Sequence, residues 1–109
     1  MPRLLLINGL PGSGKSTLAA RYVADRPRAL CLDVDVVRGL LGAWSDRPHE
    51  AGLLARRLAL AMARLALGEG RDVVVPQFLA RPVFIGELEA LAGELGAEFV
   101  EVVLVEAPD

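Results

Sequence analysis

A chain of 109 residues, 53% of them hydrophobic and 24% charged, is long enough for one domain with one core and too apolar to be disordered. The formal net charge of −2 argues against a broad basic surface for nucleic acid, and a single cysteine excludes an internal disulfide. The N-terminal apolar run is too short for a signal peptide, and the apolar stretch 53–67 contains three arginines, which argues against a membrane span. We expect one globular, cytoplasmic domain over residues 1–109.

The first predicted strand, residues 3–8, is apolar without alternation, which is typical of a central parallel strand covered on both faces. A window of the form G-x-x-x-x-G-K-[ST] follows it and leads into a helix that runs to about Asp25. Glycines in such a turn let several backbone N–H groups approach one anion. The window therefore predicts a phosphate-binding loop whose residues are Gly9, Leu10, Pro11, Gly12, Ser13, Gly14, Lys15, Ser16 and Thr17.

Two side chains of this loop have expected roles in binding a nucleoside triphosphate. Lys15 is the only lysine among 12 basic residues, and its compact charge suits the β- and γ-phosphates. The Ser16 hydroxyl is placed to ligate a magnesium ion that bridges those phosphates. The alternative is a glycine-rich helix entry that binds no ligand, which the motif disfavours.

Two aspartates and an arginine follow the second predicted strand, residues 29–33, which contains Cys31 as an expected buried and inert thiol. Ligands of open α/β sheets bind at the carboxyl ends of the strands, so Asp33 and Asp35 should lie at the edge of the phosphate site. Asp35 could then orient an acceptor hydroxyl and take its proton, while Arg38 holds an anionic group of the substrate or the migrating phosphoryl. Alternatively, both aspartates cap the helix that starts near Val36, and Asp33 could do both.

The middle of the chain is predicted to form a loop and the longest helix. A short helix ends at Gly42, and the long helix, with its arginines outward, ends near Leu67. Ser45 or Asp46 is a plausible cap for the long helix, with Pro48 in its first turn. Trp44 is expected to cover the core rather than to stack on a base, and His49 is expected to be partly exposed without a role.

The remaining elements complete an alternating pattern of strands and helices. The third strand should span residues 72–75 and end at Pro76, a helix should span residues 82–95, and the fourth strand should span residues 98–105. This alternation predicts a three-layer α/β/α fold around a mostly parallel sheet of about four strands. Gly9, Asp33 and Gln77 then all fall at the carboxyl ends of strands.

The loop GLPGSGKST and the D-x-D-x-x-R segment formed by Asp33, Asp35 and Arg38 resemble the small P-loop phosphotransferases. They resemble in particular the 5′-hydroxyl polynucleotide kinase domains and the related zeta-toxin and chloramphenicol phosphotransferase kinases. The resemblance implies a P-loop NTPase fold with ATP and Mg²⁺ as co-substrates. It also implies that Asp35 activates the acceptor hydroxyl and that Arg38 contacts substrate or phosphate.

The sequence departs from these kinases in two respects. Many of them have an acidic residue where this chain has Gln77, so metal binding is expected to depend on Ser16 and Asp33, and the Gln77 amide could contact substrate. The chain also ends where the family continues into a lid, a fifth strand and an adenine-binding loop. Arg81 or Arg47 could replace the arginines of the lid, although solvated surface arginines are the favoured interpretation.

Two hypotheses about function follow. The first is a kinase that transfers the γ-phosphate of Mg-ATP to a hydroxyl of a small molecule, a nucleotide or a nucleic-acid 5′ end. The second is a nucleotide-binding module, or a truncated kinase, without transfer activity. A GTPase is disfavoured because no N-K-x-D segment is present. No membrane partner is expected, and an exposed sheet edge after the fourth strand would favour a homo-oligomer.

Overall fold

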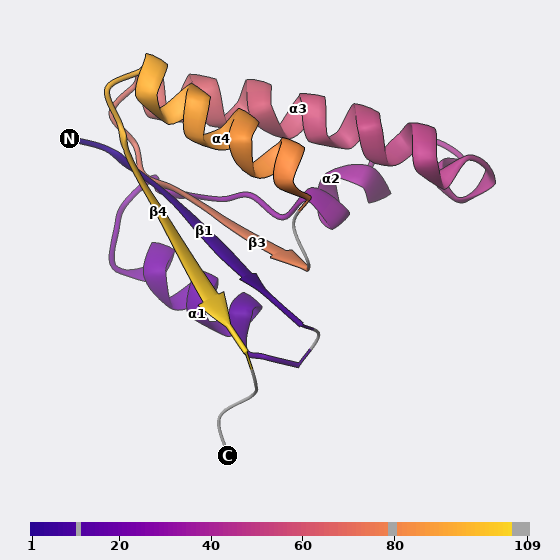
Figure 1. The fold of residues 1–109 in the computed structure, drawn as a ribbon, viewed down its shortest axis with the longest axis horizontal. Helices are drawn as coiled ribbons and strands as arrows, with labels where there is room; N and C mark the ends of the chain where they lie inside the picture. The colour runs from indigo at the N-terminus through magenta and orange to yellow at the C-terminus, as the bar shows by residue number, and fades with distance from the viewer. Residues whose placement is uncertain (11, 79–80, 106–109) are drawn as a thin grey trace.

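The structure is a computed structural model that describes residues 1–10, 12–78 and 81–105. Strands and helices alternate along the chain, with one 3₁₀ turn before the longest helix (Figure 1). The elements in order are β1 (Arg3–Gly9), α1 (Lys15–Ala24), β2 (Leu30–Cys31), α2 (Val34–Gly39), the 3₁₀ turn η1 (Trp44–Asp46), α3 (Pro48–Gly68), β3 (Val73–Phe78), α4 (Pro82–Glu94) and β4 (Glu98–Leu104).

The described residues form a four-stranded parallel sheet in the order β2-β3-β1-β4. Helix α1 covers one face of this sheet, and α3 and α4 cover the other (Figure 1). The predicted three-layer α/β/α architecture is therefore confirmed. Because all strands run in the same direction, their carboxyl ends lie at one edge, and the loop after β1 begins there.

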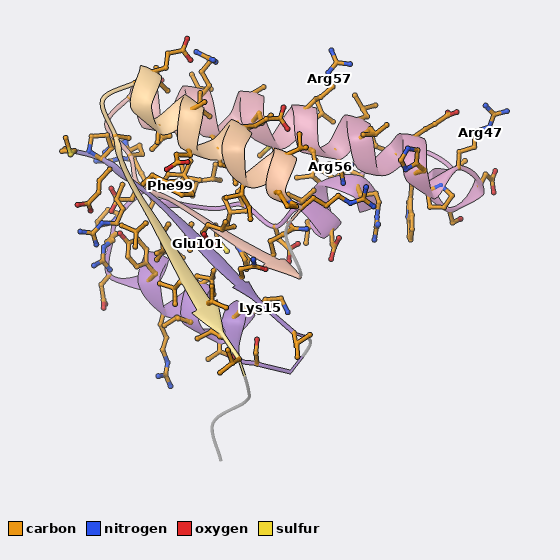
Figure 2. The ribbon with its side chains drawn as sticks, in the orientation of Figure 1. Lys15, Arg47, Arg56, Arg57, Phe99 and Glu101 are labelled. Atoms are coloured by element: carbon orange, nitrogen blue, oxygen red, sulfur yellow. The ribbon has the colours of Figure 1, made fainter. Side chains whose placement is uncertain are left out.

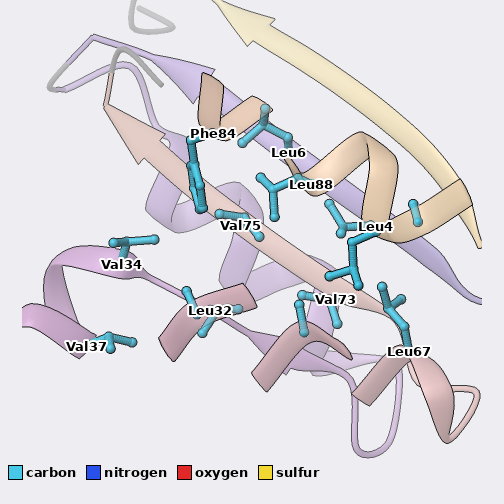
Figure 3. Close-up of a cluster of buried hydrophobic side chains, with 14 of the residues drawn as sticks. Leu4, Leu6, Leu32, Val34, Val37, Leu67, Val73, Val75, Phe84 and Leu88 are labelled. Atoms are coloured by element: carbon cyan, nitrogen blue, oxygen red, sulfur yellow. The ribbon is translucent and has the colours of Figure 1, made fainter. Parts of the chain in front are cut away.

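Alternate residues of the central strand enter two separate cores. Leu4 and Leu6 pack with β3, α3 and α4 in the larger core (Figure 3), whereas Leu5 and Ile7 pack with α1 in the smaller one. Each fully buried aliphatic side chain contributes about 1.5–3 kcal/mol relative to exposure. Both faces of β1 are thus buried, which explains its continuous apolar sequence.

A stripe of small residues brings α3 against the sheet. It recurs every fourth residue and is buried, and it consists of Ala51, Ala55, Ala59 and Ala63. Arg57 and Arg64 are exposed, as predicted, but Arg56 is half-buried. The expectation that all arginines of this helix point outward is therefore wrong for Arg56, whose environment belongs to the site described below.

Strand β3 continues beyond the predicted end at Pro76, which pairs in register with Ile7 of β1. The Leu32 N–H donates to the Val74 carbonyl, so residue 74, and with it residue 76, directs its main-chain groups toward β2. Strand β2 has already ended at Cys31. Proline is tolerated in β3 because no neighbouring strand needs its missing N–H donor at that point.

The short β2 also changes the environment of Cys31. This residue is exposed on an edge strand, so the expectation of a buried thiol is wrong. Partial desolvation, followed by the negative charge of Asp33, raises the pKa of the Cys31 thiol above its usual value. At neutral pH the thiol is therefore protonated and poorly nucleophilic, as expected from the sequence.

The start of α3 differs from the predicted cap. Ser45 and Asp46 belong to η1, and the N-cap position is Arg47, which makes no capping hydrogen bond with its side chain. Pro48 occupies the first turn, as predicted, where its missing N–H costs little. Asp46 therefore precedes the helix rather than capping it.

Candidate active site

The loop after β1 requires glycine at three positions for two different reasons. A Cβ atom at Gly9 would lie 2.8 Å from the Leu104 carbonyl oxygen and 2.8 Å from Ser13 Oγ, so β4 and the loop approach too closely for any side chain. Gly12 and Gly14 have φ angles of +77° and +92°, in the left-handed region that favours glycine. These glycines let the backbone turn sharply from β1 into α1.

Hydrogen bonds close this turn around the carbonyl of Leu10. The Ser13 N–H donates to it at 3.2 Å, and Lys15 Nζ donates to it at 3.3 Å. Ser13 is buried, and its hydroxyl has no hydrogen-bond partner among the described residues. Pro11, which the motif also includes, lies outside the described residues. The ammonium group of Lys15 is thus held at the loop rather than directed into solvent.

Helix α1 begins at Lys15 directly after the loop. Its first backbone bond runs from the Leu18 N–H to the Gly14 carbonyl, and no described side chain caps its N-terminus. The N–H groups of the first turn therefore have no intrahelical acceptors, which makes this end of the helix suited to an anion. Ser16 and Thr17 lie exposed in the same turn.

The two aspartates that follow β2 have different environments in the structure. Asp33 caps α2, because its Oδ1 accepts a hydrogen bond of 2.9 Å from the Asp35 N–H. The capping interpretation is therefore correct for Asp33, and α2 begins at Val34 rather than near Val36. Asp35 lies in the first turn of α2 with a side chain that is 63% exposed, so its carboxylate does not serve as the cap.

Arg38 lies one turn beyond Asp35 on the same helix. Its Nη2 is 3.5 Å from Asp35 Oδ1, and its guanidinium carbon is 4.8 Å from the centre of the Trp44 ring. The expectation that Trp44 covers the core is wrong, because this ring packs against Arg38 and remains 37% exposed. The contact restrains the guanidinium through a cation–π interaction. Arg38 Nε is buried without a hydrogen-bond partner among the described residues.

A polar cavity of about 300 Å³ lies between α2, α3 and the end of β3. Its lining residues are Val34, Asp35, Arg38, Gly52, Arg56, Gln77 and Arg81. The strand register places Gln77 beside Asn8, the residue before the loop. Gln77 shares the sheet face of Val73 and Val75, the face covered by α3, which is why its side chain reaches this cavity.

The structure brings most of the predicted side chains to one edge of the sheet. Lys15 lies near the carboxyl end of β1, and Arg56 lies on α3 above the same edge (Figure 2). Arg47 is not part of this group. Its side chain is exposed, and its Nη1 lies 3.6 Å from Glu50 Oε1. His49 is exposed in the first turn of α3. Neither Arg47 nor His49 lines the cavity.

Sequence reasoning missed Arg56. The available signal was Gly52, a glycine inside a helical pattern, where it is less favourable than alanine. A Cβ atom at Gly52 would lie 3.7 Å from Arg56 Nη1, so the guanidinium lies over this glycine. Recognising the partner required the three-dimensional path of α3.

The described residues contain no group of three or more His, Cys, Asp or Glu side chains arranged to hold a metal ion. A magnesium ion in a nucleotide site needs fewer protein ligands, because phosphate oxygens and water complete its octahedral shell. The hydroxyl of Ser16 and the carboxylate of Asp33 are oxygen donors of the type that magnesium prefers. These donors fit a magnesium ion that is bound together with phosphates.

Comparison with known proteins places this site in a family. A model of the AAA domain family matches residues 4–109. The chain belongs to this family. An uncharacterized protein of Mycobacterium tuberculosis, Rv2004c, is 35% identical over an alignment of 111 positions, which covers 91% of this chain and 22% of that protein. The AAA domain described here thus spans about a fifth of the length of the curated relatives it matches.

Solved structures share the fold of this AAA domain. A Pnkp1/Rnl/Hen1 complex matches with a TM-score of 0.75 and 18% identity, over 94% of this chain and 35% of that chain. APS kinase CysC of Mycobacterium tuberculosis, in complex with AMPPNP and APS, matches with a TM-score of 0.67 and 24% identity, over 94% and 62%. At such identity the likeness concerns the fold alone. No helix in the described ranges is long and apolar enough to cross a membrane.

Proposed function

We propose that this AAA domain transfers the γ-phosphate of Mg-ATP to a hydroxyl of an acceptor molecule. The observation that supports this most directly is the shared sheet edge. The loop built by Gly9, Gly12 and Gly14 lies there, and so does the Asp35–Arg38 pair. The APS kinase of the same fold is in complex with both AMPPNP and APS, which supports a proposal in which one such domain binds two small molecules.

The loop binds the triphosphate in this proposal. Backbone N–H groups of the loop and of the first turn of α1 surround the phosphates, and Lys15 leaves the Leu10 carbonyl to contact the β- and γ-phosphates. Ser16 and Asp33 would hold a magnesium ion, which would neutralise charge on the phosphates. In this structure Asp33 Oδ1 accepts the capping bond from the Asp35 N–H.

Asp35 and Arg38 act on the acceptor. The acceptor oxygen forms a bond to the γ-phosphorus as the bond to the β–γ bridging oxygen breaks, and ADP leaves. The acceptor proton moves to the carboxylate of Asp35, whose exposure leaves room for a hydroxyl. Arg38, which the Trp44 ring holds in place, stabilises the charge of the migrating phosphoryl or of the acceptor.

A transfer assay with ATP labelled at the γ-phosphate tests this function. The acceptor panel contains small alcohols, sugars, nucleosides, nucleotides and 5′-hydroxyl oligonucleotides. We expect magnesium-dependent transfer to at least one hydroxyl, with ADP formed in equal amount. Nucleotide binding without transfer to any acceptor would instead support the second hypothesis, a binding module.

One feature favours that second candidate. The end of β3 carries Gln77, which is uncharged, so Asp33 is the only carboxylate that the proposal assigns to the metal. Replacing Gln77 with Glu separates the two functions. In a kinase limited by metal binding, the variant would bind magnesium more tightly and transfer phosphate faster. In a binding module, the variant would show no transfer activity, whatever its affinity for magnesium.

A further inference from the structure

The cavity beside Asp35 has a strong positive charge. Three guanidinium groups line it, from Arg38, Arg56 and Arg81, against the single carboxylate of Asp35. Among the described residues, neither Arg56 nor Arg81 has a carboxylate oxygen within 4.0 Å. The formal excess is therefore two positive charges around about 300 Å³, which favours the entry of an anion.

Arg56 is directed to this cavity by its position on α3. Its guanidinium lies over Gly52, and the residue as a whole is half-buried, although the other charged side chains of the long helix are exposed. Arg57, the next residue, projects from α3 away from the sheet and lines a different surface groove with α4 (Figure 2). Neighbouring arginines on one helix thus have different environments, and only Arg56 faces the candidate active site.

Arg38 provides a second, independent observation. Its Nε is buried and has no hydrogen-bond partner among the described residues. A buried donor without an acceptor is unfavourable, and more so when it is charged. An oxyanion in the cavity would accept from the accessible part of this guanidinium, since the Arg38 side chain is 33% exposed. Planar guanidinium groups bind phosphate-type oxyanions through paired hydrogen bonds.

We propose that this cavity binds a phosphate or sulfate group already present on the acceptor, and that Arg56 and Arg81 determine the preference for such acceptors. This inference rests on the proposed function. The acceptor is then a small hydroxylated molecule that carries an oxyanion, with its free hydroxyl at Asp35. Arg56 and Arg81 bind the resident oxyanion, and neither residue belongs to the loop that holds ATP.

Calorimetry on the protein saturated with Mg-AMPPNP tests the proposal, because the analogue blocks the phosphate loop. The titrants are matched pairs: ribose 5-phosphate with ribose, nucleoside 3′-monophosphates with the nucleosides, a sulfated sugar with the sugar, and inorganic phosphate alone. We expect the charged member of at least one pair to bind about tenfold or more tightly than the neutral one. Equal affinity within every pair would overturn the proposal.

Variants assign the preference to particular side chains. Arg56→Gln and Arg81→Gln should each weaken binding of the charged member by about tenfold, leave the neutral member unchanged, and keep Mg-AMPPNP affinity within about twofold. Arg56→Lys should recover part of the loss because it keeps the charge. Arg57→Gln is the matched control, and a loss equal to that of Arg56→Gln would contradict a localised site.

The result also separates the two proposals. If the protein binds Mg-AMPPNP and transfers phosphate but prefers neutral acceptors, only the oxyanion site is overturned. If the wild-type protein binds no Mg-AMPPNP, the proposed function fails, and the acceptor assignment fails with it.

Discussion

Arg38 and Asp35 face each other across one turn of α2, with Nη2 of the arginine 3.5 Å from Oδ1 of the aspartate. This separation is long for a charge-assisted hydrogen bond, whose usual length is about 2.7–2.9 Å. The pair is therefore close enough for mutual attraction, while Asp35 can accept a proton from a hydroxyl. The Trp44 ring also packs against this arginine, with its centre 4.8 Å from the guanidinium carbon.

Replacing Asp35 with Asn should slow phosphoryl transfer by about 10²-fold or more, because the amide cannot accept the acceptor proton. Mg-ATP affinity should change little, since Asp35 lies at the acceptor cavity. Single-turnover transfer and calorimetry measure the two quantities. Asp46→Asn, an exposed carboxylate outside this cavity, is the control. Undiminished transfer by Asp35→Asn would show that another group takes the proton.

Replacing Trp44 with Ala should raise KM for the acceptor by about two- to fivefold, because the cation–π contact with Arg38 contributes about 0.5–1 kcal/mol at an exposed site. KM for ATP should remain unchanged. Trp44→Phe keeps an aromatic face and should restore most of the acceptor affinity. A change in KM for ATP, or no change in either value, would argue against a role in positioning Arg38.

Two glycine substitutions should have opposite effects on stability. Gly9→Ala places a methyl group 2.8 Å from a main-chain oxygen of β4 and should lower the free energy of unfolding by about 1–3 kcal/mol. Gly86→Ala lies inside α4, where an added Cβ meets no atom within 4 Å, and should raise it by about 0.4–1 kcal/mol. Urea denaturation measures both. Equal stability of the two variants would contradict the close approach at Gly9.

The environment of the Tyr22 hydroxyl should make the protein less stable at high pH. Its hydroxyl donates to Asp72 at 2.9 Å, and desolvation followed by this bond raises the pKa of Tyr22 above its usual 10.0. Because folding favours the protonated phenol, this contribution is complete below pH 10 and is lost as pH rises through the raised pKa. Urea denaturation from pH 7 to 11 should show a steeper fall for the wild type than for Tyr22→Phe. Parallel curves would refute the assignment.

Local patterns were sufficient to predict much of the fold. The apolar run before Gly9, the glycines of the loop and Pro48 at the start of α3 each specify a conformation through nearby residues. The order of strands and helices followed from their alternation. Capping by Asp33 was one of two alternatives that the sequence left open, and the structure shows it.

Features that depend on distant neighbours could not be predicted in this way. Pro76 continues β3 because β2 ends early, and the exposure of Cys31 has the same cause. Trp44 packs on Arg38 rather than on the core because η1 turns it toward α2. Arg56 reaches the cavity because the alanine stripe sets the rotation of α3 against the sheet. Each outcome is decided by packing between elements.

The central claim is that the loop between β1 and α1 binds the phosphates of Mg-ATP. Calorimetric titration of Mg-ATP into the wild-type protein and into Lys15→Ala tests it most directly, with Arg21→Ala on the same helix as the control. We expect saturable binding by the wild type and by Arg21→Ala, and affinity weaker by about tenfold or more in Lys15→Ala, because a charge-assisted contact is lost. No binding by the wild type, or equal affinity in Lys15→Ala, would contradict the claim.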